Sequence, residues 1–184
     1  PIRREVTQKM WQIAISIIFN VVYLKGDTLI LSLFRSQTEV GLYGAAYRVI
    51  DILSQLAMMI MGVMLPLLAA SWAKHDEREF NEHYQQSFTV LMVIGLPIAT
   101  GASLLAPRAL TLVFGSEFAA AGPMLGLLSW AVLGVFVGAV FGHAAVAINR
   151  QKNTMWIYIS NAIITLLGYL WAIPRYGWLG AATL

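Results

Sequence analysis

The amino-acid sequence predicts an all-α fold, a polytopic transmembrane helix bundle with about five complete spans and the start of a sixth. Hydrophobic residues occupy 59% of the 184 positions and charged residues only 11%, whereas soluble domains carry about 25% charged residues. The apolar residues also form runs long enough to cross the hydrocarbon core, which takes about 20 helical residues. A surface of this composition requires lipid around it, so we expect a multi-pass membrane protein.

The apolar segments can be placed one after another along the chain. The first is about 24 residues long and crosses the core with some tilt. The second and third carry Pro66 and Pro97, which membrane helices tolerate as kinks. The predicted complete spans cover residues 11–34, 40–72, 88–105, 123–148 and 155–173, and a sixth begins at Trp178.

Two connections between the spans have predicted structures of their own. Residues 74–86, KHDEREFNEHYQQ, are strongly polar, and we expect them to form a helical extension in the cytoplasm. Residues 107–115 are expected to form a short stretch at the membrane surface. In the polar connection His75, Glu79 and His83 repeat every four residues and could face one metal ion, but a charged segment without a fourth ligand favours a solvated face.

The distribution of basic residues predicts the orientation. With the N-terminal end inside, seven Lys and Arg lie in cytoplasmic segments and three in external ones, which fits the positive-inside rule. We therefore expect a protein of the cell inner (plasma) membrane whose N-terminal end is cytoplasmic, and the net charge of +3 does not indicate a nucleic-acid partner. The seven are Arg3, Arg4, Lys9, Lys74, Arg78, Arg150 and Lys152, and the three are Arg35, Arg108 and Arg175.

The sequence also bears on domain organisation and chemistry. No low-complexity linker or soluble domain interrupts the chain, so we expect residues 1–184 to form a single transmembrane bundle. Because the chain begins with Pro1 and ends at Leu184 within a new apolar segment, we expect a piece of a longer protein, cut at both ends.

The chain contains no cysteine, and it lacks the HExxH, P-loop and nucleophile-elbow motifs. We expect no enzymatic activity, no metal site and no cofactor.

Four charged residues lie inside the first two spans: Lys25, Asp27, Arg48 and Asp51. A charge at the centre of a bilayer costs about 2.5–3.5 kcal/mol on insertion scales, so such residues usually face a partner or a water-filled cavity. At about 100° per residue they share polar faces with other side chains. One face holds Ser16, Asn20, Tyr23 and Asp27, and the other holds Tyr47, Arg48, Asp51, Ser54 and Gln55.

The depths of these charges predict a pairing. Asp27 and Arg48 each lie about 12 Å below the outer end of their helix, so we expect them to pair. Lys25 is level with Asp51 but lies about 200° around the helix from Asp27. Either Gly26 loosens the helix or Lys25 points elsewhere.

Two interpretations of the polar faces remain. Ion pairs that only hold helices together would explain the four charges. The additional polar residues favour a cavity in the outer half of the membrane that takes an anionic or polar substrate. The candidate substrate-binding residues are Arg48, Asp27, Asp51, Asn20, Tyr47, Gln55 and Lys25.

Two weaker signals lie in the fourth span. His143 lies about 10 Å from the cytoplasmic end of this span and could relay protons, although a packed or snorkelling side chain is commoner. Gly134 and Gly138, four residues apart, predict close packing against another helix.

Five segments occur in order along the chain: YLKGDTLILSLF (23–34), EVGLYGAAYRV (39–49), MLPLLAAS (64–71), LVFGSEFAAAGPMLGLLSW (112–130) and IPRYGWLGAATL (173–184). Together they resemble the polysaccharide transporter family of lipid-linked oligosaccharide flippases. This family belongs to the superfamily that also holds the multidrug and toxin extrusion (MATE) exporters and the lipid II flippase. The resemblance runs through most of the chain.

The resemblance implies more than the residues do. Members of this family have two six-helix lobes around a central cavity and alternate between inward- and outward-facing states, and this chain would be most of the second lobe. The implied substrate is an oligosaccharide on undecaprenyl pyrophosphate, and the implied partners are this substrate, membrane lipid and the missing first lobe. Arg48 matches an arginine often found on the eighth helix, with a role in attracting pyrophosphate or an acidic sugar. A proton or sodium ion is a common coupling ion in the superfamily.

Four alternatives stay open. A MATE-type exporter would bind organic cations through acidic residues and has little use for an arginine in its cavity. A lipid II flippase fits the five segments less well. A scaffolding subunit would use the ion pairs only to lock helices, and a membrane glycosyltransferase or ligase would need a large external loop, which the chain lacks.

Overall fold

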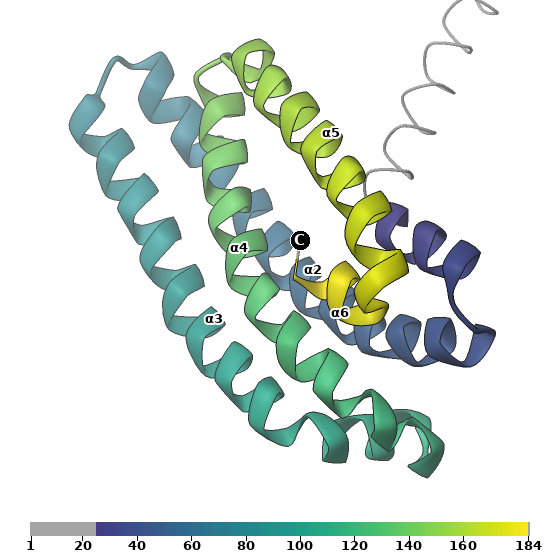
Figure 1. Ribbon diagram of the computed structural model, residues 1–184. Helices are drawn as coiled ribbons and strands as arrows, with labels where there is room; N and C mark the ends of the chain where they lie inside the picture. Colours follow the sequence, from purple (N-terminus) through teal and green to yellow (C-terminus); the bar gives the residue numbers. More distant parts are fainter. Residues whose placement is uncertain (1–24, 184) are drawn as a thin grey trace, which may run out of the picture. The chain divides into compact units, whose positions relative to one another are not determined.

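The computed structural model of the protein describes residues 25–183, without the side chains of residues 151–159. It confirms the all-α prediction, because the described residues are helices joined by short turns (Figure 1). Helical residues 25–34 come first. They are followed by α2 (Gln37–Ala73), α3 (Glu77–Phe114), the 3₁₀ helix η1 (Ser116–Ala121), α4 (Gly122–Ala147), α5 (Gln151–Tyr176) and α6 (Trp178–Ala182).

The chain divides into two compact units. Unit 1 comprises residues 1–40 and 161–184, and unit 2 comprises residues 41–160. Helices α2 and α5 each contribute residues to both units. The single bundle expected for residues 1–184 stays a prediction.

Three helical stretches within the described residues are long and apolar enough to cross a membrane: Gln37–Ala73, Glu77–Phe114 and Ser116–Ala147. They correspond to the second, third and fourth predicted spans. Helix α2 begins and ends within three residues of the span predicted at residues 40–72, and α4 within one residue of that predicted at 123–148. Most of the first predicted span lies outside the described residues, and the fifth corresponds to α5.

The end predicted for the third span at residue 105 is wrong, because α3 continues through Pro107 to Phe114. The 3₁₀ helix η1 follows Gly115. The position of residues 107–115 at the membrane surface stays a prediction. The helix continues because Ala106 and Leu110, on either side of the proline, are buried and pack in the core. Gly115 then ends the helix with a positive φ of 103°, a conformation that glycine adopts readily.

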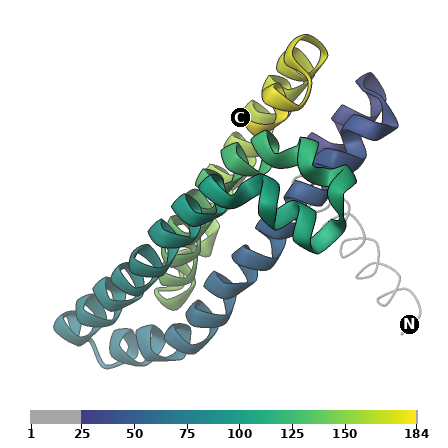
Figure 2. The same ribbon diagram turned by 90° about the horizontal axis from the view of Figure 1, so that it is seen from below.

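The core of unit 2 is the antiparallel pair of α3 and α4. Tyr84 near the start of α3 contacts Phe141 near the end of α4, with ring centroids 6.1 Å apart. Phe136 is fully buried, and the two helices lie side by side with η1 at their turn (Figures 1 and 2). A larger share of α4 than of α2 or α3 is buried, so α4 forms the inner helix.

Glycines set the closest approach between α3 and α4. A Cβ at Gly95 would come within 2.9 Å of the Phe136 ring, and one at Gly122 within 2.6 Å of Pro107. Gly134 and Gly138, which were expected to pack closely, meet nothing within 4 Å among the described residues. The close packing expected at these two glycines therefore has no counterpart among the described residues.

Large apolar side chains are exposed on the helices. Leu104 and Leu112 of α3 are 82% and 88% exposed, and Ile164 of α5 is 69% exposed. Exposed apolar area on this scale is unfavourable in water. These faces fit contact with lipid chains or with further transmembrane helices.

Candidate functional site

The polar face predicted on the second span forms a strip on α2, here called the α2 strip. It consists of Tyr47, Arg48, Asp51, Ser54 and Gln55, all in unit 2. Since α2 is helical throughout, their spacing of i, i+1, i+4, i+7 and i+8 keeps them on one side of the helix. Arg48, Asp51 and Gln55 are exposed, whereas Tyr47 and Ser54 are half-buried.

The inner members of the α2 strip contact their own helix. The Tyr47 ring lies 5.8 Å from that of Tyr43, which is fully buried. The Ser54 hydroxyl donates a hydrogen bond of 2.8 Å to the carbonyl oxygen of Ile50. The exposed members can therefore present a guanidinium, a carboxylate and an amide together on a fixed helical scaffold.

The length of α2 limits how deep in the membrane the α2 strip needs to lie. Residues 52–73 contain no Asp, Glu, Lys or Arg and extend for about 33 Å as a helix. A stretch of that length fills the ~30 Å hydrocarbon core by itself. Arg48 and Asp51 therefore precede a stretch of α2 that could fill the core without them, a position that would lower the cost of keeping them charged.

The unit 1 members of the predicted site lie in helical residues 25–34. Asp27 is buried, with 4% of its surface exposed, and its Oδ1 accepts hydrogen bonds from the backbone N–H (2.6 Å) and the hydroxyl (3.2 Å) of Thr28. These bonds offset part of the cost of burying a carboxylate. Lys25 is half-buried.

Gly26 lies within the helical residues 25–34. The direction in which Lys25 points relative to Asp27 stays a prediction. Because Asp27 and Arg48 belong to different units, their pairing stays a prediction. Asn20, with Ser16 and Tyr23, lies outside the described residues.

Two of the three residues with metal-ligand spacing near the start of α3 have separate side-chain partners. Nδ1 of His83 lies 3.2 Å from the hydroxyl of Ser71, which donates to the carbonyl of Leu67. Glu79 forms an ion pair of 3.4 Å with Lys74, and His75 is exposed in the turn before α3. No group of three metal-ligating side chains occurs in the part of the chain that the structure describes.

The polar connection before the third span is helical, as predicted. Asp76 caps α3 by accepting a hydrogen bond of 2.9 Å from the backbone N–H of Glu79. Arg78 pairs with Glu82 one turn later at 3.0 Å, and both side chains are exposed. These contacts explain how a charged sequence extends a membrane-length helix.

His143 has a hydrogen bond within its own helix. It is half-buried, and its Nδ1 lies 2.7 Å from the carbonyl oxygen of Ala139. Since a carbonyl only accepts, Nδ1 carries the proton in this arrangement. Proton relay through His143 stays a prediction.

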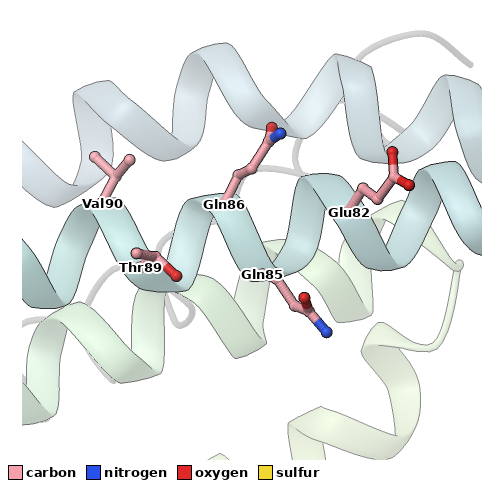
Figure 3. Close-up of a pocket in the computed structure, with 5 residues that line it drawn as sticks. All are labelled: Glu82, Gln85, Gln86, Thr89 and Val90. Atoms are coloured by element: carbon pink, nitrogen blue, oxygen red, sulfur yellow. The ribbon is translucent and has the colours of Figure 1, made fainter.

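A hollow on α3 was not predicted from the sequence. It is lined by Glu82, Gln85, Gln86, Thr89 and Val90, all from α3 (Figure 3). These residues lie where the charged start of α3 meets its apolar part, and all five are exposed. The i, i+3, i+4, i+7 spacing of the polar side chains could have revealed this face. A hollow on a single helix does not enclose a ligand.

A family model described as polysaccharide biosynthesis protein matches residues 3–123. The chain belongs to this family. The matched region of the chain contains the α2 strip and Asp27. The flippase-type resemblance predicted from the five segments is confirmed. The chain is thus part of a multi-pass membrane protein with transporter relatives.

Curated relatives have related names. The chain is 24% identical over 168 residues to a probable low-salt glycan biosynthesis flippase of Haloferax volcanii, covering 91% of this chain and 36% of that protein. It is 27% identical over 187 residues to a succinoglycan biosynthesis transport protein of Rhizobium meliloti, covering 86% and 37%. It is 21% identical over 143 residues to a teichuronic acid biosynthesis protein of Bacillus subtilis, covering 77% and 29%.

The chain spans about a third of the length of the curated relatives it matches, with shares of 36%, 37% and 29%. No solved structure matches the chain. The relatives' names therefore describe proteins of which this chain corresponds to one part.

Proposed function

We propose that this chain is part of a flippase that moves a lipid-linked oligosaccharide across the cytoplasmic membrane for surface polysaccharide biosynthesis. Family membership over residues 3–123 supports this function most directly. The names of two relatives, a glycan biosynthesis flippase and a succinoglycan transport protein, point in the same direction. The finer proposal is an undecaprenyl-pyrophosphate carrier that is turned from the inner to the outer leaflet by alternating access.

In this proposal the α2 strip forms part of the substrate path. The exposed Arg48 guanidinium can bind a phosphate oxygen pair through two parallel N–H donors, and it stays charged at any physiological pH. Asp51 and Gln55, one and two turns along the same side, can bind sugar hydroxyls. Because the strip lies next to the end of the uncharged part of α2, a pyrophosphate at headgroup depth would be within reach.

The proposed flippase has a defined orientation in the membrane and an ion gradient as its energy source. The N-terminal end of this chain faces the cytoplasm of a cell inner membrane, as the Lys and Arg distribution indicates. A proton or sodium gradient drives the cycle, and the remainder of the longer protein supplies the other wall of the cavity. Asp27, Asn20 and Lys25 belong to the same path, with Asp27 as the partner of Arg48.

The test uses the full-length protein in its host, with surface polysaccharide as the measured product. Arg48→Ala is expected to lower export about tenfold or more, because a bidentate charged contact to phosphate is lost. Arg48→Lys is expected to recover only part of the activity, since lysine keeps the charge but not the fork geometry. Arg108→Ala is the matched control, as Arg108 is also an exposed arginine on a long apolar helix.

Two outcomes would contradict the proposal. One is normal export by Arg48→Ala and Asp27→Ala at wild-type protein levels. The other is an unchanged polysaccharide together with lost resistance to cationic drugs, which would indicate a MATE-type exporter instead. Membrane abundance of each variant, measured by immunoblot, separates loss of transport from loss of folding.

A further inference from the structure

Two turns that are far apart in the sequence contact each other at one end of unit 1. Nη2 of Arg35, in the turn before α2, donates to the carbonyl oxygens of Ile173 (3.4 Å) and Pro174 (3.2 Å) in the last turn of α5. Oε1 of Glu39, in the first turn of α2, accepts a hydrogen bond of 3.0 Å from the backbone N–H of Trp178. These contacts join residues separated by 138 or 139 positions.

Each of the two charged side chains lies at a helix end whose partial charge is opposite to its own. The last carbonyl groups of α5 carry partial negative charge, which suits the Arg35 guanidinium, although that of Ile173 also accepts a hydrogen bond of 2.9 Å from the backbone N–H of Gly177. Trp178 begins α6, where unpaired N–H groups carry partial positive charge, which suits the Glu39 carboxylate. Arg35 and Glu39 thus cap the end of one helix and the beginning of the next.

Gly177, between α5 and α6, allows this arrangement. Its φ of 60° and ψ of −134° form a conformation that residues with a Cβ rarely adopt. A Cβ there would also lie 2.6 Å from Oε1 of Glu39 and 3.1 Å from Nε of Arg35. Any other residue would have to strain the turn and push both caps away.

We propose that Arg35, Glu39 and Gly177 form a latch that holds the α5–α6 turn against the start of α2 and keeps unit 1 together as one body during transport. The transport role rests on the proposed function, whereas the contacts do not. Glu39 and Gly177 lie in segments that carry the family resemblance, residues 39–49 and 173–184, whereas Arg35 lies between two such segments. Nε of Arg35 is buried without a hydrogen-bond partner among the described residues. Leaving this donor unsatisfied costs free energy, which the two hydrogen bonds of the same guanidinium offset in part.

The direct test measures amide hydrogen exchange at Trp178 in the full-length protein, reconstituted in lipid nanodiscs. Glu39→Ala removes the acceptor, so exchange at Trp178 is expected to be about tenfold faster or more. Glu39→Gln is the matched control, because its amide oxygen can still accept, and exchange is expected to stay within about threefold of wild type. Unchanged exchange in Glu39→Ala would overturn the latch.

A charge exchange separates helix capping from a simple ion pair. The double variant Arg35→Glu/Glu39→Arg keeps both charges but places each at the wrong helix end, so fast exchange at Trp178 is expected. Restored slow exchange in this variant would overturn the capping mechanism. Gly177→Ala is also expected to speed exchange at Trp178. If Gly177→Ala does not accumulate in the membrane, Arg35→Lys serves as the milder variant.

Export of surface polysaccharide tests the role in transport. Variants with fast exchange are expected to export at least about fivefold less than Glu39→Gln at equal abundance in the membrane. Fast exchange with normal export would overturn the transport role of the latch. If the proposed function is wrong, the Arg48 variants export polysaccharide normally. That result differs from failure of the latch, because it does not depend on the exchange measured at Trp178.

Discussion

The contact between Gly95 and Phe136 gives the sharpest prediction about stability. A methyl group added at Gly95 would lie 2.9 Å from Cδ2 of Phe136 and 3.0 Å from Cδ2 of Leu133, whereas carbon atoms prefer separations of about 3.5–4.0 Å. Phe136 is 0% exposed, so its ring cannot yield without moving α4. Overpacking of this kind typically costs about 1–3 kcal/mol.

Gly101 provides a matched control on the same helix. A Cβ there meets nothing within 4 Å among the described residues, so Gly101→Ala gains only the helix propensity of alanine, about 1 kcal/mol. Gly95→Ala gains the same propensity and loses the packing energy. The free energies of unfolding of the two variants should therefore differ by about 1–3 kcal/mol, with Gly95→Ala the less stable.

The assay is equilibrium unfolding of the full-length protein in mixed micelles, with sodium dodecyl sulfate as the denaturant. The midpoint is expected to fall for Gly95→Ala and to stay level or rise for Gly101→Ala. Shortening the opposing side chain in Gly95→Ala/Phe136→Leu should recover part of the loss, because contacting residues couple by about 0.5–3 kcal/mol. A midpoint for Gly95→Ala equal to or above that of Gly101→Ala would refute the packing argument.

Three further predictions use the same unfolding assay. Asp76→Ala should lower the free energy of unfolding by about 0.5–2 kcal/mol through loss of the α3 cap, and Asp76→Asn, which can still cap, should be nearly neutral; equal losses would contradict the capping role. Phe136→Ala should cost about 3–5 kcal/mol, since the side chain is fully buried, and a loss below about 1 kcal/mol would mean that the site is not a packed core. Gly122→Ala should be destabilising where Gly134→Ala is not, because only the former meets Pro107; the reverse order would contradict the α3–α4 geometry.

The sequence predicted the class, most helix boundaries and the polar strip. Long uncharged runs such as residues 52–73 can satisfy their backbone in lipid only as helices, so composition alone indicates the secondary structure. The strip from Tyr47 to Gln55 follows from the helical period once α2 is a helix. Pro107 predicts a boundary, whereas α3 continues past it to Phe114, with Ala106 and Leu110 buried on either side of the proline.

The latch and the close helix contacts were not predictable in this way. Residues 35–39 and 173–178 are separated by more than 130 positions, and no local pattern indicates that Arg35 caps α5 or that Glu39 caps α6. Several glycines lie in apolar helices, but only Gly95 and Gly122 meet the opposing helix of the α3–α4 pair closely. The sequence by itself determined that this chain is a membrane helix protein with charged side chains on a polar helical face, because those properties depend on hydropathy and helical period. Which side chains meet was decided by tertiary structure alone, because contacts between distant segments depend on the register and direction of packed helices.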